Sequence, residues 1–182
     1  MTRPEWFVCV GELELAGDVT WYGMATEGRW VHSKLLSGPS RAPVYAGFYW
    51  SQMDDEPAVA RVSMVVLPLA DPARIVAADW NDGYNGYEPA PLDEYAVLCS
   101  TAFDPTHVSG RDAEDDLREA ERIITAGNRE GRRVNYAEIV TDPDRAGNAL
   151  FFPVDGEERN GYEAVEDDET VVCLTFVAHD WP

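Results

Sequence analysis

The densest set of possible ligand atoms lies in residues 79–88, DWNDGYNGYE, where carboxylate and amide oxygens recur beside glycines. A hard cation such as Ca²⁺ takes about six to eight oxygens from a tightly curved backbone. The oxygen-bearing residues are Asp79, Asn81, Asp82, Asn85 and Glu88. Their spacing does not fit an EF-hand, because counting from Asp79 puts Tyr84 at position six and Ala90 at position twelve. We therefore predict no metal site here.

The same stretch supports a different hypothesis, in which its aromatic side chains contact a partner. Trp80, Tyr84 and Tyr87 stand among small polar residues. Rigid amphipathic rings in such surroundings are typical of binding surfaces. Packing of these rings on a sheet is the competing interpretation.

Nucleophilic, phosphate-binding and redox chemistry find little support in the sequence. The cysteines are Cys9, Cys99 and Cys173, and the histidines are His32, His107 and His179. The three cysteines are far apart in apolar runs, which predicts reduced, buried thiols. The histidines lie on separate segments without metal-ligand spacing. The sequence contains neither a G-x-S-x-G nucleophile elbow nor a P-loop. We therefore predict no catalytic residue and no cofactor.

Acidic charge is the most prominent property of the chain. The 182 residues carry 34 Asp and Glu against 14 Lys and Arg, a formal net charge of −20. Such a charge repels nucleic acid and anionic membranes and attracts basic surfaces. Lys34 is the only lysine, a bias typical of high-GC coding, as in actinobacteria and their phages. A halophilic surface is the alternative explanation for the acidic residues.

Three acidic clusters are the candidate contact surfaces for a basic partner. We expect the contact charges to be Asp54, Asp55, Glu56, Asp115, Asp116, Glu166, Asp167, Asp168 and Glu169, with Trp80, Tyr84 and Tyr87 as anchors. A solvated loop or a helix start matched to its dipole is the simpler interpretation of any one cluster.

The periodicity of apolar residues predicts strands separated by turns, with one long helix. Strands are expected at 5–15, 19–24, 29–36, 43–51, 59–69, 94–102, 133–141, 148–154 and 170–178. Asp71-Pro72 predicts a short helix over 72–78, and residues 79–91 read as a loop. The long helix is expected over 111–126, with a Ser109–Asp112 capping arrangement and Gly127 just beyond its end. Gly47 predicts a bulge or a close backbone approach, and Pro68 should end its strand.

These elements predict an α+β fold: a mostly antiparallel β-sheet or two-sheet sandwich with one principal α-helix packed on it. The length suggests a single acidic globular domain over 1–182. The N-terminal apolar run is too short for a signal peptide, so we expect a cytoplasmic protein of the source cell or of an infected host.

The resulting hypothesis is a non-enzymatic acidic module that binds a basic protein, for example a nuclease, on its nucleic-acid-binding surface. A DNA mimic, an immunity protein and a phage anti-defence protein all fit this description. The first alternative is a virion or other assembly component. The second is a metal-dependent enzyme whose site is assembled from distant residues, with Asp79, Asp82 and Glu88 and either His107 or His179 as partners.

Overall fold

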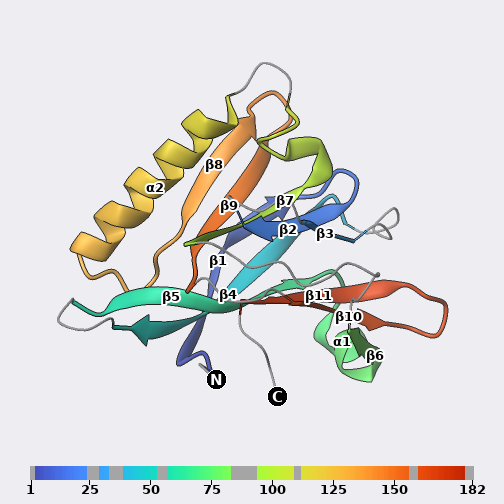
Figure 1. The fold of residues 1–182 in the computed structure, drawn as a ribbon. Coiled ribbons are helices and arrows are strands. Elements are labelled where there is room, and N and C mark those ends of the chain that lie inside the picture. Colours follow the sequence, from blue (N-terminus) through green and yellow to red (C-terminus); the bar gives the residue numbers. More distant parts are fainter. Residues whose placement is uncertain are drawn as a thin grey trace.

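The computed structural model describes residues 3–23, 29–32, 39–52, 57–82, 94–108, 112–155 and 160–178. Eleven strands and two α-helices lie in these ranges, and all paired strands run antiparallel. The strands form two sheets, and the long helix lies along one of them (Figure 1). This arrangement confirms the predicted α+β class.

The first sheet has six strands in the order β1-β4-β5-β11-β10-β6. Their bounds are β1 Trp6–Glu14, β4 Arg41–Ser51, β5 Val59–Pro68, β11 Val171–Val177, β10 Asn160–Val165 and β6 Asp79–Asp82. The second sheet has five strands in the order β3-β2-β7-β9-β8. Their bounds are β3 Arg29–His32, β2 Val19–Gly23, β7 Tyr95–Ser100, β9 Gly147–Pro153 and β8 Ala137–Asp142, and a 3₁₀ turn, Thr101–Phe103, follows β7.

The main core fills the space between the two sheets. Trp21 of the second sheet is fully buried and stacks on Phe176 of the first, with ring centroids 5.5 Å apart. Leu13, Phe48 and Phe152 belong to the same cluster. Burial of side chains this large is the dominant stabilising contribution, at roughly 2–3 kcal/mol each.

Each sheet also carries a helix on its outer face. α2 (Ala113–Arg129) buries Ala120 and Ile124 against the second sheet. α1 (Pro72–Ala77) packs Ile75 near Ala164 and Cys173 of the first sheet. The order of layers is therefore α1, first sheet, second sheet, α2. Among the described residues, neither helix has the length and apolar character needed to cross a membrane.

Several local predictions are confirmed. The β5 strand ends at Pro68, which has no N–H to donate. Asp71 caps α1 by accepting from the backbone N–H groups of Ala73 and Arg74. The register shifts after Gly47, and a Cβ there would lie 2.8 Å from the ring of Phe7. Glycine at this position thus permits the predicted close approach.

The long helix differs from its predicted limits. It begins after Asp112, which caps it, and continues to Arg129, whereas Ser109 lies outside the described residues. Gly127 is buried inside the helix and does not follow its end. Its missing side chain makes room for Asn135, whose amide donates to the Ile124 carbonyl at 2.9 Å. Gly131, with φ +65°, is the glycine that follows the helix end.

Two strands escaped prediction. Residues 79–82 were expected to be a loop, but they form β6, which pairs with β10. No element was expected between the strands at 148–154 and 170–178, but Asn160–Val165 is β10. Each segment is held by its neighbouring strand, so its own polar composition does not decide its structure. Cys9 is exposed, contrary to prediction, whereas Cys99 and Cys173 are buried.

Candidate partner-binding pocket

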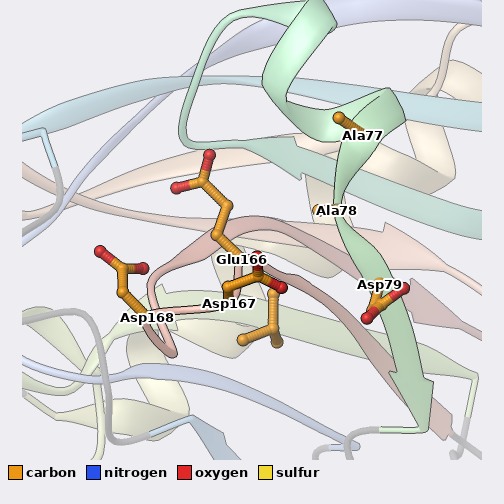
Figure 2. A pocket seen from close by; sticks show the side chains of 7 residues that line it. Ala77, Ala78, Asp79, Glu166, Asp167 and Asp168 are labelled. Carbon is orange, nitrogen blue, oxygen red and sulfur yellow. The ribbon is translucent and has the colours of Figure 1, made fainter.

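A pocket of about 440 Å³ lies where the α1–β6 junction meets the turn between β10 and β11 (Figure 2). Its lining residues are Ala77, Ala78, Asp79, Val165, Glu166, Asp167 and Asp168. The short helix stops at Ala77, and the chain then enters β6, where Asp79 pairs with Val165. This pairing sets the carboxylate of Asp79 beside the acidic turn.

Backbone hydrogen bonds order the turn that carries Glu166, Asp167, Asp168 and Glu169. Glu166 N–H donates to the Thr170 carbonyl at 2.9 Å, and Glu169 N–H donates to the Glu166 carbonyl at 2.9 Å. Thr170 N–H donates to Asp168 Oδ1 at 3.0 Å. Glu169 has φ +66°, the left-handed conformation that glycine normally occupies in such hairpin turns. The four consecutive carboxylates are therefore carried on a fixed backbone.

One guanidinium from α1 joins this turn. Arg74 Nε donates to Glu166 Oε1 at 2.8 Å, and Arg74 Nη2 donates to Oε2 of the same carboxylate. The bidentate pair lowers the pKa of Glu166 and raises that of Arg74. Hydrogen bonds from Thr170 lower the pKa of Asp168. Both carboxyl groups are consequently ionised at neutral pH.

The charge around the pocket remains strongly negative despite this pair. In Figure 2 the side chain of Glu166 points toward α1, whereas Asp167 stands on the turn and Asp79 on the neighbouring strand β6. Neither Asp79 nor Asp167 has an ion-pair partner among the described residues. Within the described part of the chain, the carboxylates near the pocket are Asp71, Asp79, Glu166, Asp167, Asp168 and Glu169, and Arg74 is the cation paired with one of them. Such a site favours a cationic side chain.

The predicted contact charges on α2, Asp115 and Asp116, are less available to a partner than those of the β10–β11 turn. Asp115 pairs with Arg118, which also contacts Glu114 at 3.2 Å. Glu119 pairs with Arg122, whose Nε lies 2.8 Å from Oε2. Asp116 is only 5% exposed, so its carboxylate is not presented to a partner in this conformation. Arginines thus already neutralise much of the exposed charge of this helix.

The two acidic regions also lie on opposite sides of the molecule. α2 covers the outer face of the second sheet, whereas the acidic turn belongs to the first sheet (Figure 1). Both sheets separate them, so one flat partner surface cannot contact both. Trp80 is on β6, next to Asp79, and is 51% exposed. Asp54, Asp55, Glu56, Tyr84 and Tyr87 lie outside the described residues.

Those residues proposed for metal or acid–base chemistry that the structure describes are not brought together. Asp79 and Asn81 stand on an extended strand, without the tight curvature of a calcium loop. His107 lies 3.3 Å from the buried carboxylate of Asp104, on the loop that follows β7. Glu88 and His179 lie outside the described residues. Within the described ranges, no group of three or more His, Cys, Asp or Glu side chains could hold a metal ion.

A second groove, of about 600 Å³, was not predicted from the sequence. It lies between β1 and β8, at the edges of the two sheets. Glu12, Glu14 and Glu138 line it, but Arg41 occupies it and lies 2.9 Å from Glu14. The β10–β11 turn therefore keeps the larger excess of carboxylates over guanidinium groups.

Comparison with known proteins gave no relative: no family model, no curated protein and no solved structure matches this chain.

Proposed function

We propose that the protein is a non-enzymatic acidic module that binds a basic, nucleic-acid-binding surface of a partner protein. The observation that carries this proposal is the β10–β11 turn, Glu166–Glu169, beside the pocket that Asp79 borders. Four consecutive carboxylates stand there on a hydrogen-bonded backbone. In the proposed complex, these carboxylates contact the lysines and arginines with which the partner otherwise binds the phosphates of nucleic acid.

Pre-organisation supports this function. Binding by a mobile acidic tail requires ordering of its backbone, at about 1–2 kcal/mol per residue. The turn is already ordered by its own hydrogen bonds, so little of that cost arises on binding. Its carboxylates are part of the formal net charge of −20, which attracts a basic partner at long range and accelerates association.

Backbone strain at Glu169 also supports the proposed function. A residue other than glycine in the left-handed region costs about 1–2 kcal/mol, and Glu169 has φ +66°. Glycine at this position would relieve the strain but remove the carboxylate. Retention of a strained residue is a reason to look for a function of its side chain.

The exposed indole of Trp80 provides an apolar contact beside these charges. Aromatic anchors usually contribute more affinity than charges at the rim of an interface. Trp80 is opposite Ala164 in the β6–β10 pairing, and Ala164 packs near α1. Trp80 therefore lies on the face that carries α1, where a partner seated on the turn can reach it.

The test is affinity capture from a lysate, followed by titration of the captured protein. The wild-type chain is compared with a turn variant, Asp167→Asn/Asp168→Asn/Glu169→Gln, and with a matched α2 variant, Glu114→Gln/Asp115→Asn/Glu119→Gln. Both variants remove three exposed carboxylates without changing side-chain size much. The two variants lose the same formal charge, but the α2 carboxylates are paired with Arg118 and Arg122, whereas those of the turn have no ion pair among the described residues.

We expect the wild type to retain a basic protein that high salt releases and that duplex DNA displaces. The turn variant should bind that protein at least about tenfold more weakly and with a smaller salt dependence, whereas the α2 variant should stay within about twofold. A partner that binds both variants equally, or that still binds DNA when saturated with the protein, would contradict the proposal.

A further inference from the structure

We propose that the edge of β1 receives an extended segment of a partner protein, which adds a seventh strand to the first sheet. β1 and β6 stand at opposite ends of the strand order of this sheet, so the β1 edge is remote from the β10–β11 turn. The incoming segment carries apolar side chains and at least one arginine or lysine. This surface is independent of the function proposed above.

The two sheets end at different places on this side of the molecule. β1 packs against β9 of the second sheet, and β8 is the next strand beyond β9. Ala137 and Ile139 of β8 pack against α2, so Val140, on the other face of the strand, is directed to the side of the first sheet. Val140 is nevertheless 51% exposed and lines the groove of about 600 Å³. Among the described strands, none of the first sheet covers it.

The backbone of β1 directs hydrogen-bonding groups away from its neighbour β4. Phe48 of β4 accepts a 2.7 Å hydrogen bond from the backbone N–H that precedes β1. Ala46, two residues earlier, therefore also faces β1, where it pairs with Val8. Because this direction alternates along a strand, the N–H and C=O groups of Phe7 and Cys9 face away from β4. In the described part of the chain, these four groups form no hydrogen bond.

Further along the same edge, a side-chain amide already makes the bonds of a neighbouring strand. Asn148 of β9 accepts from the Glu14 N–H at 3.0 Å and donates to the Glu12 carbonyl at 2.8 Å. The backbone of an adjacent strand would make the same two kinds of bond. An incoming strand continues this pattern along Phe7 and Cys9, as in recognition by β-strand addition.

Exposed apolar side chains gather at the β1 edge. Phe7 is 49% exposed, and Tyr45, which pairs with Cys9 from β4, is 40% exposed. With Val140, they are three of the five large hydrophobic side chains that are exposed in the described part of the chain. A concentration of exposed apolar surface marks an interaction site. A strand beside β1 would cover part of it.

The charges at this edge favour a basic segment over a second copy of the chain. Glu12, Glu14 and Glu138 line the groove, and Arg41 is the cation among its lining residues. Arg41 lies 2.9 Å from Glu14 but 3.5 Å from Glu12, whose side chain is 58% exposed. A second copy would bring the same glutamates and another net charge of −20. An arginine or lysine on the incoming strand instead pairs with Glu12.

The probe is a labelled nine-residue peptide with blocked ends, in which valine and threonine alternate between two terminal arginines. Its length equals that of β1. One control peptide has proline at its centre, and another has glutamates in place of the arginines. In about 150 mM salt, the proline peptide should bind at least about tenfold more weakly than the probe, because it lacks a ladder N–H. The glutamate peptide should bind at least about fivefold more weakly.

Matched variants at exposed positions locate the binding surface. Val140→Thr should weaken binding of the probe about three- to fivefold, because it removes an apolar contact. Val76→Thr on α1, where Val76 is 85% exposed, is the control and should leave the affinity unchanged. Glu12→Gln should weaken binding about two- to threefold, whereas Glu114→Gln, which also removes an exposed glutamate that contacts an arginine, should not. The turn variant, which tests the proposed function, should bind the probe within about twofold of the wild type.

Cys9 reports directly on whether the β1 edge is covered. Its thiol is exposed, whereas Cys99 and Cys173 are buried, so iodoacetamide should modify Cys9 first. We expect saturating probe to slow alkylation of Cys9 at least about tenfold and to protect its backbone N–H from hydrogen exchange.

Three results would overturn the inference. The first is absence of probe binding up to about 1 mM, and the second is binding without protection of the Cys9 N–H. The third is a dimer in solution whose Cys9 is protected without any peptide, because the occupant of the edge would then be a second copy of the chain.

Discussion

The backbone N–H of Glu14, at the edge of the first sheet, donates to Oδ1 of Asn148 in the second sheet at 3.0 Å. The side-chain amide of Asn148 donates in return to the Glu12 carbonyl at 2.8 Å and to Glu138 Oε1 at 2.7 Å. One buried side chain thus takes the place of a neighbouring strand at this edge. It also ties the two sheets together at the end of the core.

We expect Asn148→Ala to lower the free energy of unfolding by about 2 kcal/mol or more, because partly buried backbone groups of β1 lose their partners. Asn148→Asp keeps the acceptor for Glu14 N–H but sets a carboxylate against the carboxylate of Glu138, so it should cost at least as much. Urea denaturation measures both. Asn81→Ala, at an exposed position of β6, is the control and should stay within about 0.5 kcal/mol. If Asn148→Ala changed the free energy of unfolding as little as the control does, the Asn148 hydrogen bonds would not stabilise this edge.

Gly127→Ala should destabilise the protein, although a glycine-to-alanine change in an exposed helix stabilises by roughly 1 kcal/mol. The new Cβ would lie 2.1 Å from Oδ1 of Asn135, so the Asn135 side chain must move and strain its hydrogen bonds. Overpacking of this kind costs about 1–3 kcal/mol. Denaturant titration gives the sign directly, and a stabilised variant would contradict the packing.

Asn135 supplies the check on that mechanism. If the clash causes the loss, Gly127→Ala and Asn135→Ala should together destabilise by less than the sum of the single changes. Additive effects would place the cause elsewhere in the helix.

Glu169→Gly should stabilise the fold by about 0.5–1 kcal/mol, since glycine adopts φ +66° without the penalty of other residues but loses more entropy on folding. The same substitution should weaken binding of hexa-arginine, because it removes one carboxylate of the turn. Thermal unfolding and peptide titration measure the two effects. Ala146→Gly is the matched control: Ala146 has φ +54° in the β8–β9 turn and carries no charge. It should stabilise similarly and leave binding unchanged.

Local chemistry explains which parts of the fold could be predicted. Proline and cap residues act on their nearest neighbours, so the end of β5 at Pro68 and the start of α1 after Asp71 followed from two or three residues. β6 depends on pairing with β10, about eighty residues further along the chain. β10 also pairs with β11 through a short turn, and no element was predicted over its residues. The polar residues of β6 predicted a loop, because nothing local indicates the strand that stabilises them.

The candidate site shows the same division. The acidic turn was visible in the sequence as Glu166–Glu169, but its counter-ion was not. Arg74 is 92 residues away from Glu166 and unremarkable in its own segment. The burial of Asp116 follows from the side of α2 that faces the second sheet. The fold therefore decides which acidic residues have an arginine partner.

Stability should fall in alkaline solution because of Cys173. Burial raises the pKa of its thiol from 9.0 to about 11. Between these values the unfolded chain has lost a proton that the folded chain keeps, so the free energy of unfolding decreases as pH rises. The loss is complete above about pH 11.

The variant Cys173→Ala lacks this pH-dependent contribution to stability. Burial also raises the pKa of Tyr95 and Tyr136, but both are present in either protein and cancel in the comparison. Urea titrations from about pH 8 to about pH 11 should show the wild type losing more stability than Cys173→Ala. A difference between the two proteins that stays constant across this range would show that the thiol titrates normally in the folded state.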